Sequence, residues 1–162
     1  MRDMVLGQDA SFTDAAFIQR LNSDLANDLG NGLNRVAKLM AKHFEEKVPT
    51  YSYWGDEEEE LKISGQAVLK KSKDLILNLK LSHGIEEIFT LVRQVNKYLE
   101  VKAPWKLAKA SDKKDELASC LVTAANALAI ALRLLSPIMP TKCPQGLAML
   151  GISSSRELAW GM

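Results

Sequence analysis

Apolar residues recur every three or four positions along most of the chain, which is the spacing of helices that bury one face. The first such pattern follows Ser11 or Thr13, either of which can cap a helix. Its apolar positions are Phe17, Leu21, Leu25, Leu29, Leu33, Val36, Leu39 and Met40. The pattern ends before Pro49. Gly30 and Gly32 interrupt it, and because glycine costs about 1 kcal/mol relative to alanine inside a helix, they indicate a bend or the close approach of another backbone.

The acidic run 56–60 marks the start of a second helix, since carboxylates are favourable in the first turn. We interpret the run as solvated. A cation site is the alternative interpretation, but consecutive carboxylates point in different directions on a helix. The helix is expected to continue to about residue 79. Its expected buried positions are Leu61, Val68, Leu69, Leu75, Ile76 and Leu79.

Three further helices are expected. Residues 82–84, Ser-His-Gly, form a break that can cap a third helix with a clean apolar face over 85–99. A fourth begins at Ser111 or Asp112 and continues to residue 135, and a short fifth covers 144–150. No segment alternates with period two over a convincing length. The pattern therefore predicts an all-α fold, an antiparallel bundle of about five helices, as a single domain over residues 1–162.

Composition adds limits rather than a function. The chain has 162 residues, enough to bury a core, and 21 Lys plus Arg against 20 Asp plus Glu, so an RNA site requires local clustering of charge. Cys120 and Cys143 are too far apart for a metal knuckle and indicate reduced thiols. No apolar run approaches the roughly 20 residues that span a bilayer, and no signal peptide begins the chain. We expect a cytoplasmic protein without a membrane partner.

Catalytic motifs are not found in the sequence. It contains neither a Gly-rich phosphate loop, nor a Gly-x-Ser-x-Gly elbow, nor a His-Glu-x-x-His motif. His43 and His83 have no nearby cysteine or paired carboxylate, and their expected role is structural. We predict no catalytic residue and no metal site.

The binding candidates are more specific. Asn31 and Arg35 are four residues apart, so their side chains share one helix face about 6 Å apart. An amide and a guanidinium can both bond base edges, although an ordinary surface pair is the alternative. Trp105 follows Pro104 in a break between two helical patterns, where it is either an exposed stacking surface or a plug packed on the third helix.

Lysines gather around this tryptophan, and a local excess of positive charge is what phosphate binding needs. They are Lys97, Lys102, Lys106, Lys109, Lys113 and Lys114. Of these, we expect Lys102, Lys106 and Lys109 to contact an RNA backbone.

Four segments resemble the anticodon-binding domain of the methionyl-tRNA synthetase family, within the class Ia synthetases. They are 20–31 with Asn34-Arg35, 96–98, 103–109 and 132–140. The resemblance implies a helical bundle that binds the CAU anticodon. It implies that Trp105, its backbone held by Pro104, stacks on a base while Asn31 and Arg35 contact anticodon bases. Its implied partners are the anticodon stem-loop of tRNA and the catalytic domain of the same enzyme.

The family's catalytic nucleotide-binding domain, with its His-Ile-Gly-His and Lys-Met-Ser-Lys-Ser signatures, is not found in this sequence. ATP and methionine bind that domain, so the resemblance implies part of a methionine–tRNA ligase, with no cofactor in this chain and no activity of the chain alone. Two alternatives stay open. One is the anticodon domain of another class I synthetase, such as the cysteine or leucine enzyme. The other is a helical interaction module without RNA binding, favoured by the near-zero net charge and the acidic run.

Overall fold

The computed structural model describes residues 21–45, 48–50 and 52–152, with only the backbone described for 21–24 and 26. Within these residues every regular element is helical, which confirms the all-α prediction. The elements are the π-helix η1 (Leu21–Gly30), α2 (Asn31–Phe44), α3 (Asp56–Leu77), α4 (Leu81–Lys102), α5 (Pro104–Leu107), the 3-10 turn η2 (Ser111–Lys113), α6 (Lys114–Leu135) and α7 (Lys142–Met149). The caps expected at Ser11 or Thr13 lie outside the described residues.

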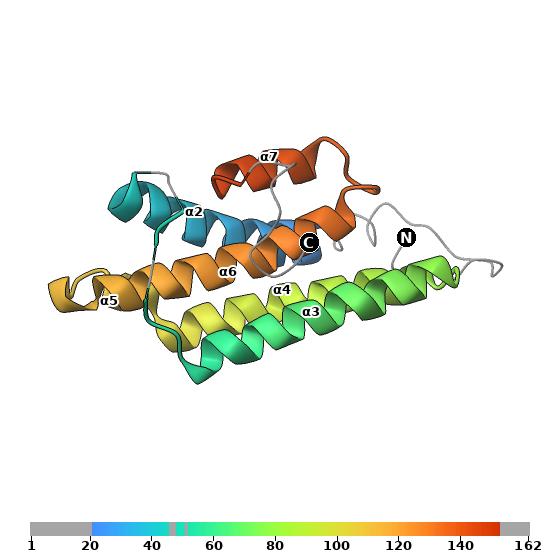
Figure 1. Cartoon of the computed structure of the whole chain (residues 1–162). Coiled ribbons are helices and arrows are strands. Elements are labelled where there is room, and N and C mark those ends of the chain that lie inside the picture. The colour runs from blue at the N-terminus through green and yellow to red at the C-terminus, as the bar shows by residue number, and fades with distance from the viewer. Residues whose placement is uncertain (1–20, 46–47, 51, 153–162) are drawn as a thin grey trace.

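The helices form a bundle around α6 (Figure 1). Helices α3 and α4 lie side by side as an antiparallel hairpin on one side of α6, and α2 packs on it from another side. Helix α7 contacts both α2 and α6, and the short α5 closes the end of the bundle where α6 begins. The bundle predicted from periodicity is therefore the observed one.

Helix α6 is the core of the molecule. Every residue from 117 to 132 is buried, and small alanines alternate with leucines so that neighbouring helices approach closely. No apolar run of membrane-spanning length was expected, yet Ser111–Leu135 is long and apolar enough by length and composition alone. The apolar window of this segment is 94% buried inside the bundle, as befits a core helix. The two cysteines are buried and unpaired.

The connection between α3 and α4 differs from the expectation. Helix α3 ends at Leu77, and Leu79, expected in the core, is 74% exposed in a left-handed turn with φ of 59°. Helix α4 begins at Leu81, so the expected break at 82–84 is wrong. Gly84 lies inside α4 rather than at a break. Only glycine fits here, because a Cβ at this position would lie 2.7 Å from Ile76 Cγ1. This glycine serves close packing of α4 on α3.

The acidic run opens α3 as predicted, but it is not uniformly solvated. Glu58 is completely buried, and its carboxylate accepts the backbone N–H of Gly55 at 3.0 Å. Glu59 accepts the indole N–H of Trp54 at 2.8 Å. Two acids of the run therefore fix the preceding connector, and Glu58 is the one acid of the run that is buried rather than solvated.

The ends of the later helices also shift. Ser111 and Asp112 do not cap α6 with their side chains but form the turn η2 before it. The last helix begins two residues earlier than expected, at Lys142. A tie between distant segments was not foreseen: Asp115 in the first turn of α6 accepts the backbone N–H of Ser52 at 2.9 Å and that of Tyr53 at 2.7 Å. This tie fastens the α2–α3 connector to the start of the core helix.

Candidate nucleic-acid interface

The turn between α4 and α5 presents a tryptophan to solvent. Helix α4 ends at Lys102, and Ala103 adopts a left-handed conformation with φ of 45°. Pro104, whose fixed φ suits the first position of a helix, then starts α5. Pro104 and Leu107 are buried, whereas Trp105 between them is 41% exposed. Trp105 is therefore partly covered by the bundle and partly open to solvent.

A second set of exposed groups lies along α2. Side chains spaced by four, three and four residues share one face of a helix. On α2 that face carries Asn31, Arg35, Lys38 and Lys42, all exposed, while Gly32, Leu33, Val36 and Met40 are buried. We call Asn31, Arg35, Lys38 and Lys42 the polar stripe. Lys38 and Lys42 were not recognised in the sequence, although their spacing from Arg35 was the available signal.

Contacts with α4 and α6 fix the level of the stripe in the bundle. The Asn96 amide of α4 donates to the Asp28 carbonyl at 2.9 Å, just before α2 begins. A Cβ on Gly32 would lie 3.1 Å from Asn96 Oδ1 and 3.6 Å from Leu128 Cδ2 of α6. The start of α2 therefore rests in the angle between α4 and α6.

From that contact α2 and α4 run in the same direction, because each is antiparallel to α6 (Figure 1). The end of α2 meets the start of α6, where Lys114 Nζ lies 5.7 Å from the centre of the Phe44 ring. Helix α4 covers about 9 Å between Asn96 and its last residue, at 1.5 Å per residue. Arg35 and Trp105 thus both lie beyond the Asn96 contact, toward the α5 end of the bundle.

Asn31 and Arg35 lie on the flank of α2 away from the α7 contact, whereas Lys38 of the polar stripe lines the cavity between α2 and α7. Leu33, on the opposite flank, approaches Gly146 of α7, where an added Cβ would lie 3.4 Å from Leu33 Cδ1. Asn34, Ala37 and Ala41 line a cavity with the last residues of α7. Asn31 and Arg35 are therefore not covered by α7. Within the described residues, the side chains of Asn31, Arg35 and Trp105 take part in no hydrogen bond or ion pair.

The lysines near Trp105 divide into two kinds. Lys106 and Lys109 are exposed and have no acidic partner in the described part of the chain. Lys102, expected to contact RNA, is instead enclosed: its side chain is 7% exposed, and Nζ lies 2.9 Å from a Glu58 oxygen and 3.3 Å from a Glu57 oxygen. The expectation for Lys102 is wrong, because a buried ammonium paired with two carboxylates cannot reach a phosphate without breaking both ion pairs.

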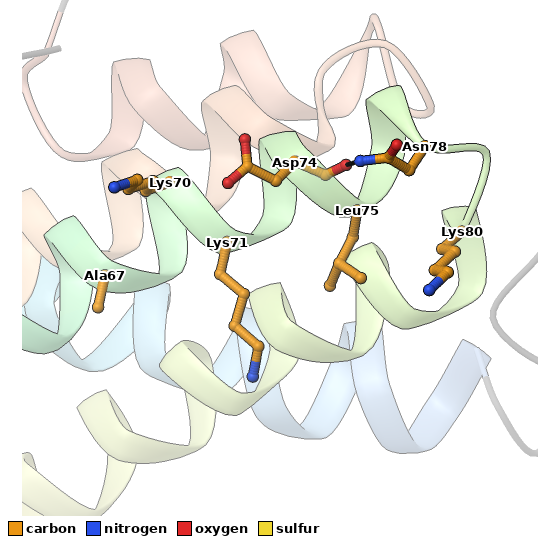
Figure 2. A pocket seen from close by; sticks show the side chains of 7 residues that line it. All are labelled: Ala67, Lys70, Lys71, Asp74, Leu75, Asn78 and Lys80. Carbon is orange, nitrogen blue, oxygen red and sulfur yellow. Dashed lines mark hydrogen bonds between the residues drawn. The ribbon is translucent and has the colours of Figure 1, made fainter.

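A different open groove lies at the other end of the α3–α4 hairpin (Figure 2). It has a volume of about 670 Å³ and is lined by the last turns of α3 and by Lys80. Lys71 on its wall already pairs with Glu87 at 2.6 Å, and the Asn78 amide donates to the Asp74 carbonyl at 2.7 Å. The Lys80 end of this groove lies about 33 Å from Trp105 along α4, and Lys71, which pairs with Glu87, lies about 23 Å from it along the same helix. Among the described residues no group of three His, Cys, Asp or Glu is placed to hold a metal.

Chemically, the α5 end suits an unstacked nucleic acid. An exposed indole stacks on any base, a contribution of roughly 1–3 kcal/mol. Free amide and guanidinium groups supply the directional hydrogen bonds that stacking lacks. Lys106, in the same short helix as Trp105, and Lys109, just after that helix, add positive charge next to the ring.

Comparison with known proteins agrees with this chemistry. The family profile of the anticodon binding domain of methionyl tRNA ligase matches residues 48–161, which include Pro104 and Trp105. The chain is 33% identical over 162 residues to methionine–tRNA ligase 1 of Bacillus anthracis, covering 99% of this chain and 24% of that protein. It is 40% identical over 140 residues to the methionine–tRNA ligase of Enterococcus faecalis, covering 86% of this chain and 21% of that protein.

The fold gives the same result. The apo crystal structure of Mycobacterium tuberculosis methionyl-tRNA synthetase matches with a TM-score of 0.90 at 28% identity, over 98% of this chain and 32% of that one. The chain spans about a quarter of the length of the curated relatives, which confirms that the resemblance concerns one part of a larger protein. The chain belongs to the family of anticodon-binding domains of methionyl-tRNA ligases.

Proposed function

We propose that this chain binds the CAU anticodon of methionine tRNA through the α5 end of its bundle. The observation that carries the proposal is that the side chains of Trp105 in α5 and of Asn31 and Arg35 in α2 are exposed and bond no other described residue. The family membership supplies the class of ligand. It also argues against an anticodon domain of the cysteine or leucine enzyme, because the matching profile and the relatives are methionine–tRNA ligases.

In this proposal the residues divide the work. Trp105 stacks on an anticodon base, and buried Pro104 holds the ring's backbone in place. Asn31 and Arg35 discriminate between bases, since their donors and acceptors are directional and the ring's stacking is not. Lys106 and Lys109, together with Lys38 and Lys42 of the polar stripe, contact phosphates.

The intact ligase would use this domain to place tRNA. Its remaining part, about three quarters of the relatives' length, would bind ATP and methionine and aminoacylate the acceptor end. The bundle would hold the anticodon so that the acceptor end reaches that part of the enzyme. Because ATP and methionine would bind that other part, we expect that the chain alone does not make methionyl-adenylate. We place the protein in the cytoplasm, where translation occurs.

The test is direct binding to RNA. A labelled anticodon stem-loop with CAU is titrated with the chain at low salt, beside a stem-loop changed only at the first anticodon base. A clear preference for CAU supports the proposal. Equal, salt-sensitive binding to both would reduce the function to a general RNA contact. No binding to either would favour a helical interaction module without RNA binding.

A further inference from the structure

A cluster of polar side chains centred on a buried carboxylate adjoins the turn that carries Trp105, since one of its members, Lys102, immediately precedes Ala103. Its centre is the Glu58 carboxylate, which has no solvent exposure. The Tyr98 hydroxyl donates to it at 2.6 Å, the Gly55 N–H donates at 3.0 Å, and the Lys102 ammonium lies 2.9 Å away. We call Glu58, Tyr98 and Lys102 the clamp.

The protonation states of the clamp suit these bonds. Burial opposes the charge of Lys102, yet its hydrogen bonds with Glu58 and Glu57 and their charges raise its pKa above the ordinary value. The ammonium therefore stays charged at neutral pH. Burial raises the pKa of the Tyr98 hydroxyl far above its ordinary range, so this group remains a donor. Glu58 thus has donors from three directions.

The clamp joins three parts of the fold. Glu58 belongs to the first turn of α3, and Tyr98 and Lys102 belong to the last turns of α4. Gly55, which is bonded to Glu58, ends the α2–α3 connector. A buried ion pair rarely adds more stability than apolar side chains of the same size would, because both charges must leave water. What such a pair does supply is a fixed geometry, since both charges are strongly unfavourable when separated.

The fixed position of Lys102 matters for the conformation of the residue that follows it. Ala103 follows Lys102 and holds a left-handed conformation, which is unfavourable for a residue with a Cβ. Its carbonyl accepts the N–H of Lys106 at 2.7 Å, so the direction of Ala103 sets the direction of α5. Trp105 lies within this turn, two residues after Ala103. A shift of Lys102 would therefore turn the ring.

We propose that Glu58 and Lys102 are positioning residues for anticodon recognition, because their buried ion pair fixes the α4–α5 turn that presents Trp105. The inference rests on the proposed function for its biological meaning. The geometric part concerns the free protein and is measurable without RNA.

The experiment uses the whole chain labelled with 5-fluorotryptophan. The chain has three tryptophans, and Trp105→Phe identifies the fluorine signal of the ring in question. The variants are Glu58→Gln, Lys102→Met, which keeps the length of the side chain without its charge, and Lys102→Arg, which keeps the charge. The control is Leu135→Ala, a buried position at the far end of α6, which lowers stability without touching the clamp. All are compared well below their melting temperatures.

The expected result has two parts. In the free protein the Trp105 signal shifts or broadens in Glu58→Gln and Lys102→Met, and stays near its original position in Lys102→Arg and Leu135→Ala. Binding of the CAU stem-loop weakens in the first two variants by at least about fivefold, the lower limit of a base–aromatic stack. The other two bind as the unmodified chain does.

An unchanged Trp105 signal in folded Lys102→Met overturns the inference, and so does an equal change in Leu135→Ala. A changed signal with undiminished binding also overturns it. If Glu58→Gln does not fold, the pair of Lys102 variants decides the matter alone. If the unmodified chain binds no stem-loop, the proposed function fails, while the fluorine signal in the free protein still decides whether the clamp positions the ring.

Discussion

Gly32 and Asn96 meet where α2 crosses α4, so closely that a Cβ on Gly32 would lie 3.1 Å from Asn96 Oδ1. The Asn96 side chain cannot easily yield, because its amide donates to the Asp28 carbonyl at 2.9 Å. One contact therefore places the start of α2, and with it Asn31, against the helix that leads to Trp105. The two helices approach here because position 32 has no side chain.

The first prediction concerns Gly32→Ala. Alanine favours the helix by about 1 kcal/mol, but displacing Asn96 costs a hydrogen bond and its packing, so we expect a net loss of about 1 kcal/mol in unfolding free energy. Urea denaturation measures it. In an Asn96→Ala background the obstacle is gone, and the same substitution should stabilise the protein. Stabilisation already in the unmodified background would mean that the close approach carries no cost.

The second prediction separates affinity from discrimination. Trp105→Ala should weaken binding to every anticodon loop by roughly 5- to 150-fold, the range of one lost stacking interaction. Asn31→Ala and Arg35→Ala should instead reduce the ratio of affinities between CAU and a loop changed at one base. Competition binding with the two stem-loops measures both quantities. Equal loss of discrimination in all three variants would contradict the division of roles, and loss of the fold in all three would make the roles structural.

The third prediction concerns the lysines. Lys106→Ala and Lys109→Ala should each flatten the dependence of log affinity on log salt by about 0.7, the share of one phosphate contact on a single strand. Lys70→Ala is the matched control, an exposed lysine on α3 beside the distant groove. Stem-loop titrations at several salt concentrations give the slopes. An equal effect at Lys70 would indicate general electrostatic attraction without a defined interface.

The fourth prediction concerns Asp115. The backbone N–H and hydroxyl of Ser52 and the N–H of Tyr53 lower the pKa of this carboxyl below its ordinary value of 3.8. Its contribution to stability is therefore present above that value and lost as pH falls through the lowered pKa. Asp115→Asn should reduce the melting temperature at neutral pH, and the difference should shrink progressively below pH 3.8.

The control for Asp115 is Asp112→Asn, an exposed acid that has no bonded partner among the described residues. It should change the melting temperature little at any pH. A deficit of Asp115→Asn that persists unchanged in acid would show that the carboxylate charge is not what ties the connector to α6.

The buried faces of the helices could be predicted because apolar residues three or four positions apart lie on one face of a helix, and that face packs against the core. Ile85, Ile88, Phe89, Val92, Val95 and Leu99 are all buried, as their spacing indicates. The end of α3 could not be placed in this way, because Leu77 and Leu79 are apolar yet exposed. Gly84 resembled a break for a related reason: sequence does not distinguish a glycine that ends a helix from one that lets two helices touch.

Charge was the least predictable property. Glu58 and Lys102 each belong to a run that looks solvated, and only the fold shows that the two pair across 44 positions of sequence. Local pattern contains no signal for such a pair. The place of Trp105 beside Pro104, outside any apolar stripe, left an exposed ring and a packed plug both open, and only the fold shows that the residue is 41% exposed. The resemblance supplied its role, which remains a prediction.

The measurement that tests the central claim most directly is a nuclear magnetic resonance map of the bound stem-loop. The chain labelled with ¹⁵N is titrated with the CAU stem-loop while the side-chain signals of Trp105, Asn31 and Arg35 are followed. The account predicts that these three signals shift together and that signals near Lys70 and Lys80 stay in place. Shifts confined to the groove at the opposite end of the α3–α4 hairpin, with none at Trp105, would contradict it.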